Sequence, residues 1–359
     1  MIPGRSSALA LIALTLCAGA AGAEPAKAPR KGRLLPVGAA IVPGLLVHGS
    51  GHWVAGDRQV ARRLFAMEGI GLGMAAAGGA HLFFTGASRH HSGPPIALIV
   101  SGVGLFGISW LADVVGVAGG AHEAEEAAHP AVEAHAGYGY IDDPRFQYGS
   151  FAVAEASAWI GANRIAPSAW IALNDDNQRL RLEATRRFAG DGSARPTGDG
   201  SRVELTVALT HHRYPGEGFA VTTGEVSAGG RLDLARLGGS LAGSFAELSL
   251  GLGGEAINYY TPGAGADLGE LLLVRFAYGM LLGRPGRANG EASLYYDHRR
   301  DTFTGGLSPG NGPGSGFAGF FGAQLHLYLD ARWGIQARIE QGAARLATAG
   351  LLFRLGGTP

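Results

Sequence analysis

The strongest constraint in this sequence is a period of two in hydrophobicity that recurs from about residue 147 to residue 355. Between Phe321 and Leu329 every second residue is apolar, and the residues between them are small or polar. Successive side chains of a strand point to opposite faces, so this segment is predicted to be a β-strand with one apolar and one polar face. The pattern fits a soluble sandwich, whose apolar face points to a core. It fits equally a membrane barrel, whose apolar face points to lipid.

The length of these runs favours the membrane barrel. Most reach ten residues or more, whereas strands in soluble domains average about five or six residues. A tilted strand needs about nine to eleven residues to cross a bilayer. A barrel with both ends on one side needs an even number of strands, so we expect ten, or twelve if 137–141 and 151–161 are also strands. The ten strands are predicted to begin near Ile165, Gln178, Ser201, Phe219, Ser240, Leu268, Asn289, Gly316, Gly334 and Arg345.

The connections between the runs alternate in length. Counted back from a last strand over 346–355, those on one side are short, and those on the other are long and rich in glycine and proline. The short ones fall near 331–333, 284–288 and 236–239, and the long ones near 300–315 and 258–267. Residues 189–200 depart from this pattern, with a long connection on the short side. Outer-membrane barrels have short periplasmic turns and longer outer loops.

These patterns make residues 147–359 resemble the Gram-negative outer-membrane β-barrel proteins, at the level of the class and without a family motif. The resemblance implies an antiparallel up-and-down transmembrane barrel in the outer membrane of a Gram-negative bacterium. It also implies contact with the lipid bilayer and insertion by the barrel-assembly machinery. In that class the machinery commonly reads a last strand that ends in an aromatic residue. The nearest aromatic residue here is Phe353, which RLGGTP follows.

The first residues predict a secretory signal peptide over 1–23. Arg5 supplies an early positive charge, residues 8–16 are apolar, and small residues stand at Ala21 and Ala23 before the expected cleavage point. The only cysteine, Cys17, lies inside this segment. The alternative of a lipid on Cys17 is less favoured because the bulky Leu16 precedes it. Cleavage after Ala23 leaves no cysteine for a disulfide or thiol catalysis, which is typical of a bacterial envelope protein.

Residues 34–120 lack the alternation and predict a helical hairpin region. Segments 64–86 and 95–120 are each near the length of about 20 residues that crosses a bilayer as a helix. Both are rich in glycine and alanine, which lets helices pack closely. Glycine is abundant throughout, with 61 of 359 residues, against a usual share of about 7%. This abundance fits tightly curved strands, turns and close-packed membrane helices.

Each of these two segments carries one acid, Glu68 or Asp113. An acid inside a membrane helix is a functional candidate by default, but structural pairing with Arg62, Arg63, His81 or Arg89 is the favoured interpretation. Our hypothesis is that the helices are hydrophobic only marginally, escape arrest in the inner membrane, and pack against the barrel wall or lie at the periplasmic leaflet. The alternative keeps the hairpin in the inner membrane and makes the β region a periplasmic sandwich.

Histidines occur in two places where their spacing could suit a metal site. His48 and His52 are four residues apart, but glycines between them disfavour a stable helix, so a turn is the favoured interpretation. Residues 121–146 form an acidic spacer, rich in alanine and histidine, that is predicted to be a solvated linker before a barrel domain over 147–359. We therefore predict no metal site.

Composition argues against several function classes. Lys plus Arg and Asp plus Glu are equal at 29 each, so no basic excess suggests a nucleic acid as partner. No phosphate-binding loop or dinucleotide fingerprint is present. Nothing resembles the His-x-Ser-Asn pattern of outer-membrane lipases. We therefore expect no cofactor, no catalytic residues and no enzyme activity.

The polar faces of the predicted strands carry interspersed charges of both signs. They could form the wall of a small-solute pore or, as the alternative, a salt-bridged and non-conducting interior in a protein with a structural or anchoring role. The third possibility is a binding module of the periplasmic sandwich type, anchored in the inner membrane. The candidate lumen-lining residues are Arg202, Glu204, Glu225, Arg231, Glu247, Arg275, Glu291, Asp297, Asp330, Arg332, Arg338 and Glu340.

Overall fold

The computed structural model describes residues 34–86, 92–119, 130–144, 149–190, 200–263, 265–283, 288–299, 301–305 and 319–355. The predicted signal peptide and the first part of the predicted spacer lie outside these residues.

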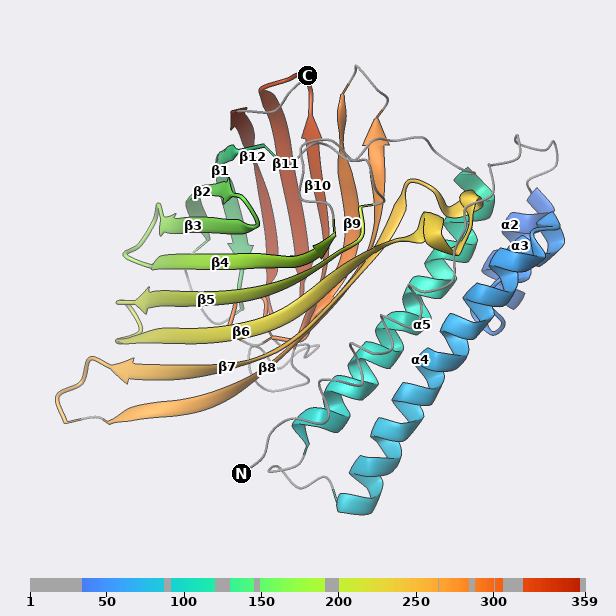
Figure 1. Ribbon diagram of the computed structural model, residues 1–359. Coiled ribbons are helices and arrows are strands. Elements are labelled where there is room, and N and C mark those ends of the chain that lie inside the picture. The colour runs from blue at the N-terminus through green and yellow to red at the C-terminus, as the bar shows by residue number, and fades with distance from the viewer. Residues whose placement is uncertain are drawn as a thin grey trace.

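Twelve antiparallel strands form a closed barrel in which each strand pairs with its neighbours in the chain, and β1 pairs with β12 (Figure 1). This confirms the antiparallel up-and-down barrel at the larger of the two predicted strand numbers, and the closed sheet excludes the sandwich. The strands are β1 (Val132–Asp142), β2 (Ser150–Ile160), β3 (Asn163–Ala172), β4 (Gln178–Gly190), β5 (Arg202–Tyr214), β6 (Phe219–Asp233), β7 (Ser244–Tyr259), β8 (Ala266–Gly283), β9 (Asn289–Asp297), β10 (Phe320–Tyr328), β11 (Trp333–Gln341) and β12 (Arg345–Leu355).

The barrel begins earlier than the sequence predicts. β1 starts at Val132, inside the segment 121–146 that was predicted to be a spacer, so the boundary at residue 147 is corrected. The outward positions of β1 include Ala134 and Ala136, while Glu133 and His135 alternate with them on the inner face. Alanine gives little hydrophobic contrast, and for this reason the period of two is weak in this strand.

The apolar faces of the strands point outward. On β4, Leu180 and Leu182 are 52% and 53% exposed, whereas Arg181 between them makes ion pairs inside the barrel. On β10, Phe321 is 56% exposed. In a soluble fold such residues would be buried in a core, so an outer wall of this kind requires an apolar surrounding.

The two open ends of the barrel differ. We call the end where β1 begins and β12 ends the terminal mouth, and the opposite end the far mouth. Residues 329–332 connect β10 to β11 at the terminal mouth, and β8 ends and β9 begins there, as predicted. The β6–β7 connection at this mouth is longer because it contains the 3₁₀ helices η2 (Leu234–Leu237) and η3 (Gly239–Leu241). Strand β9 ends and strand β10 begins at the far mouth.

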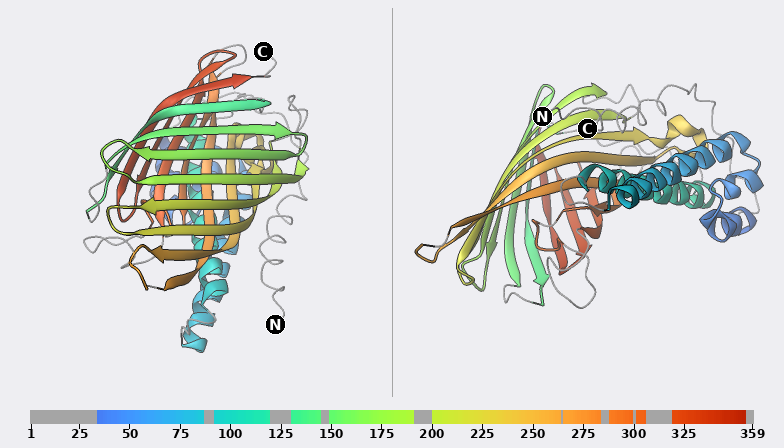
Figure 2. Two further views of the ribbon diagram at one scale, coloured as in Figure 1. Left: turned by 90° about the vertical axis from the view of Figure 1, so that its left-hand side faces the viewer. Right: turned by 90° about the horizontal axis from the view of Figure 1, so that it is seen from below.

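A helical module precedes the barrel. It consists of α2 (Leu34–Ile41), η1 (Pro43–Leu45), α3 (Ser50–Ala55), α4 (Arg58–Thr85) and α5 (Gly93–Gly119). The long helices α4 and α5 pair with each other and lie outside the barrel along one side of its wall (Figure 2). Of the helices that the structure describes, α5 is long and apolar enough to cross a membrane by length and composition.

Glycines set how closely the hairpin packs. A Cβ added at Gly71 would lie 2.7 Å from the carbonyl oxygen of Gly102, so α4 and α5 touch backbone to backbone. A Cβ added at Gly104 would lie 2.5 Å from the ring of Phe276 on β8. This second contact shows that the hairpin packs directly against the barrel wall, which is one of the two positions left open by the sequence.

A shared apolar cluster joins the hairpin to the terminal mouth. It contains Leu64 of α4, Ala112 of α5, Leu234 and Leu241 of the β6–β7 connection, and Tyr278 of β8. Polar contacts reinforce it: the Arg63 guanidinium donates to the carbonyl oxygen of Leu237 at 2.9 Å, and Ser240 Oγ donates to Asp57 Oδ2 at 2.9 Å. The module is therefore attached to the barrel at one fixed place.

Candidate functional site: the charged lumen

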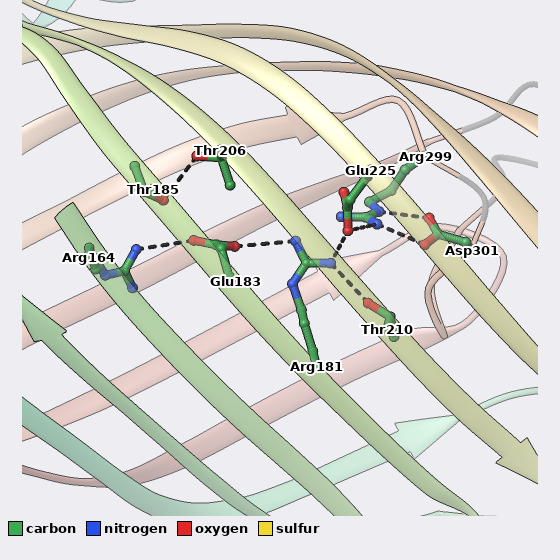
Figure 3. Close-up of polar contacts among 9 residues, drawn as sticks. All are labelled: Arg164, Arg181, Glu183, Thr185, Thr206, Thr210, Glu225, Arg299 and Asp301. Carbon is green, nitrogen blue, oxygen red and sulfur yellow. Dashed lines mark hydrogen bonds and ion pairs between the residues drawn. The ribbon is translucent and has the colours of Figure 1, made fainter.

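Alternation along each strand brings charged side chains into the lumen, because the opposite face of the same strand is apolar. One network crosses the lumen from β3 to the β9–β10 connection (Figure 3). Glu183 pairs with Arg164 and with Arg181, each at 3.2 Å. Arg181 also pairs with Glu225, which accepts from Arg299 at 3.2 Å. Both carboxylate oxygens of Asp301 then accept from Arg299 at 2.8 Å.

A second network is centred on Glu247 of β7. Its carboxylate is 2.9 Å from Arg275, 3.6 Å from Arg231 and 3.9 Å from Arg202. Arg231 also pairs with Glu291 across the lumen at 2.8 Å. One carboxylate therefore serves three guanidinium groups, which orders side chains from β5, β6 and β8 together.

Ten of the twelve predicted lumen residues belong to the lumen wall. They line its cavity or take part in its ion pairs, and they are Arg202, Glu204, Glu225, Arg231, Glu247, Arg275, Glu291, Asp297, Arg338 and Glu340.

Asp330 and Arg332 are corrected, because both lie in the exposed turn between β10 and β11. Strand β10 ends at Tyr328, so the alternation does not reach them. Asp330 Oδ1 accepts from the backbone N–H groups of Arg332 and Trp333, both at 2.7 Å. These bonds lower the pKa of the Asp330 carboxyl, because they favour its charged form. Its role is to fix the turn.

The middle of the lumen holds a cavity of about 320 Å³. Five arginines and five carboxylates line it, so its charge is balanced and not of one sign. The remaining wall consists of small polar residues such as Thr206 and Ser227, two glycines, and the apolar residues Leu248, Leu273 and Val274. The cavity is therefore hydrophilic, and its size suits a small polar solute or several water molecules.

Toward the far mouth, residues 301–305 lie inside the barrel, and Phe303 packs into an apolar cluster there. We use the name plug for residues 301–305, which fold inward from the β9–β10 connection. The ring of Phe303 lies 5.1 Å from that of Phe151, 5.7 Å from Trp170 and 4.7 Å from His212, between ring centroids, and Phe303 is only 5% exposed. Thr304 Oγ1 donates to Glu340 at 2.7 Å, and the Ala343 N–H donates to the Thr304 carbonyl at 3.1 Å.

The sequence reasoning missed this plug. Residues 300–315 were predicted as an outer loop, and Phe303 is the single aromatic residue in that glycine- and proline-rich segment. A lone aromatic residue in such a loop was the available signal, since a wholly solvated loop has no need of one.

The two acids of the helical module occupy a different kind of site. Asp113 accepts from the backbone N–H groups of Gly49, Gly51 and His52 at 2.9, 3.1 and 3.1 Å, and His52 Nδ1 lies 2.7 Å from it. Glu68 accepts from the backbone N–H of His48 at 2.9 Å. The acids therefore bind a turn, and they do not make the predicted pairs with Arg62, Arg63 or His81; the other predicted partner, Arg89, lies outside the described residues.

The turn over 46–49 and the start of α3 explain the two histidines of the sequence: His48 lies in the turn, whereas His52 lies in α3, where the sequence analysis favoured a turn. His48 Nδ1 lies 2.5 Å from Ser109 Oγ, and both histidines are 1% exposed. Among the residues that the structure describes, no group of three or more potential metal ligands lies together. The arrangement satisfies backbone N–H groups that would otherwise be buried without partners.

No protein-family model matches the sequence, and no curated protein is similar to it. Solved structures with a similar course of the chain include the translocator domain of the autotransporter NalP from Neisseria meningitidis, with 10% identity over 63% of this chain and 89% of that one, and a TM-score of 0.38. The KdgM porin is 7% identical over 62% and 99% of the two chains, with a TM-score of 0.39. The NanC porin is 8% identical over 63% and 100%, with a TM-score of 0.38.

The closed antiparallel barrel with an even number of strands, an apolar outer wall and a charged lumen is the architecture of outer-membrane β-barrel proteins. The resemblance that the sequence indicates is confirmed at this level, that of the class, and it extends to no specific family.

Proposed function

We propose that the protein is an outer-membrane barrel that provides a passage for small polar solutes and that the plug closes this passage in the present conformation. The observation that carries the proposal is the hydrophilic cavity of about 320 Å³ directly beneath an apolar closure. A passage for small polar solutes requires a hydrophilic space of this kind, and the cavity is small enough to restrict what could pass.

The outer membrane is the location that fits the wall of the barrel. The outward-facing leucines of β4 are about half exposed, which a lipid surrounding would cover. Both ends of the barrel lie at the terminal mouth, which in this class faces the periplasm. The far mouth, with the plug and the longest connection, would then face the outside, and a solute would meet the plug first.

A non-conducting structural or anchoring role is the second candidate. The observation that favours it is the density of ion pairs, because a lumen crossed by salt bridges from β3 to β9 resists opening. The two candidates differ in whether the plug can leave the lumen.

Conductance in planar bilayers tests the proposal. We expect rare openings for the native protein and a clear increase in open probability for Phe303→Ala, because the plug loses its central ring. Phe321→Ala is the matched control, since it removes the same ring from the outer wall, where Phe321 is 56% exposed. It should behave like the native protein.

The folded state of each variant is checked by gel mobility of unboiled and boiled samples from an outer-membrane fraction. A folded Phe303→Ala barrel that carries no current over many insertions would contradict the passage and favour the structural role. Recovery of the native protein with the inner membrane would contradict the location.

A further inference from the structure

Arg179 stands apart from the other arginines of the far half of the lumen. It is the second residue of β4 and faces inward, because its neighbour Leu180 is on the outer wall. Arg164, Arg181 and Arg299 each pair with at least one carboxylate. Arg179 has no ion pair or hydrogen bond from its side chain to any residue that the structure describes, and its Nε is buried.

The carboxylates around Arg179 already pair with other arginines, and a carboxylate that paired with Arg179 would have to give up one of those pairs. Asp301 is within electrostatic reach of Arg179, but both of its oxygens accept from Arg299. Glu225 is shared between Arg181 and Arg299, and Glu183 between Arg164 and Arg181. Each of these three carboxylates is therefore held by another arginine, and Arg179 is the one of the four guanidinium groups without an ion pair to a described residue. A cation in this setting gains most from an anion that comes from solution.

Two polar side chains near Arg179 have buried nitrogen atoms without a hydrogen-bond partner among the described residues. Asn177 is two residues away along the chain, and His212 of β5 is the register partner of Arg179. Each is 2% exposed, and His212 Nε2 and Asn177 Oδ1 are 2.9 Å apart. Asn177 Nδ2 has no partner among the described residues, so an amide donor is buried next to an unpaired guanidinium. Residues themselves buried to this degree normally have all their polar atoms bonded.

We propose that Arg179 and Asn177 form a binding site for a small oxyanion, a phosphate or a carboxylate group, just inside the far mouth. The planar fork of an arginine matches two oxygens of such a group, and an amide N–H supplies a further donor. Arg179 itself is only partly buried, so a solute in the lumen can reach it. The existence of this anion-binding site does not depend on the proposed function. The further statement that the passage favours small anions rests on the proposed function.

Inorganic phosphate is the probe. The native protein, folded in a neutral detergent, is heated in potassium phosphate and in potassium chloride of equal ionic strength, and the folded fraction is read from gel mobility. An anion that binds only the folded state raises its Tm. We expect a higher Tm in phosphate for the native protein and for the control Arg213→Gln. Arg213 is the neighbour of His212 in β5 and is exposed, so its loss removes the same charge from outside the site.

Arg179→Gln should bind phosphate at least about tenfold more weakly, because a charge-assisted bond is lost. If this variant does not fold, Asn177→Asp decides, since it supplies the missing carboxylate partner and should abolish the phosphate effect while the barrel stays folded. An equal rise of Tm in all variants would mean a general salt effect and would overturn the site, as would no rise in the native protein. Phosphate binding without any current in Phe303→Ala would leave the site standing and remove the passage.

Discussion

The barrel and the helical module bury their carboxylates in different ways. In the barrel, strand pairing uses the backbone N–H groups, and a carboxylate such as Glu247 has only side-chain partners, which are arginines. In the helical module, the N-terminal end of α3 and the residue before it have open N–H groups, and Asp113 accepts from three of them. The comparison teaches that the backbone, through what it leaves unsatisfied, decides which partner a buried acid takes.

Removing the acid of the helical module should have the largest effect. Asp113→Ala leaves three backbone N–H groups and the His52 ring without an acceptor, and Asp113 is fully buried. We expect the module to lose about 3 kcal/mol of stability, as when one partner of a buried charged network is removed. Limited proteolysis in detergent should show faster cleavage between residues 34 and 119, with the barrel intact. Asp267→Asn, at an exposed strand end, is the control; equal protection of Asp113→Ala would break the comparison.

Removing the central acid of the barrel should have a smaller effect. Glu247→Gln keeps the size of the side chain but removes the negative charge that faces the guanidinium groups of Arg275, Arg231 and Arg202. Because Glu247 is 21% exposed in its side chain, the guanidinium groups can be partly hydrated, and we expect a loss of about 1 to 2 kcal/mol. The free energy of unfolding in urea measures it. The double variant Glu247→Gln, Arg275→Gln should lose less than the sum of the two single variants.

The smallest effect is expected at the surface turn and depends on pH. The backbone N–H groups of Arg332 and Trp333 lower the pKa of Asp330 in the folded state. These hydrogen bonds therefore contribute their full stability above the unfolded pKa of about 4, and that stability is lost as pH falls through the folded pKa. Asp330→Asn should lower the Tm slightly at pH 7, and this difference should shrink as pH falls below the unfolded pKa of about 4. A Tm difference that persists at low pH would show that charge is not the cause.

The sequence predicts the barrel well because a period of two is local information. Each strand is read from its own residues, and ten lumen residues follow from the alternation alone. The prediction from sequence fails where the local pattern is weak or absent. The alanines of β1 weaken its alternation, and β10 ends before Asp330 and Arg332, so these two residues lie outside the lumen. The partner of Asp113 is more than 60 residues away, and Phe303 returns to the lumen from a loop. No local pattern contains these contacts.

The contact between Gly104 and Phe276 has a consequence for biogenesis. The helical hairpin is synthesised before any strand, whereas its docking surface on β8 leaves the ribosome much later. The hairpin therefore has no docking surface until the middle of the barrel exists, and until then the apolar surface of α5 that β8 will cover lacks its partner. Synthesis order and docking order therefore run in opposite directions, and the two long helices wait undocked until β8 has been made.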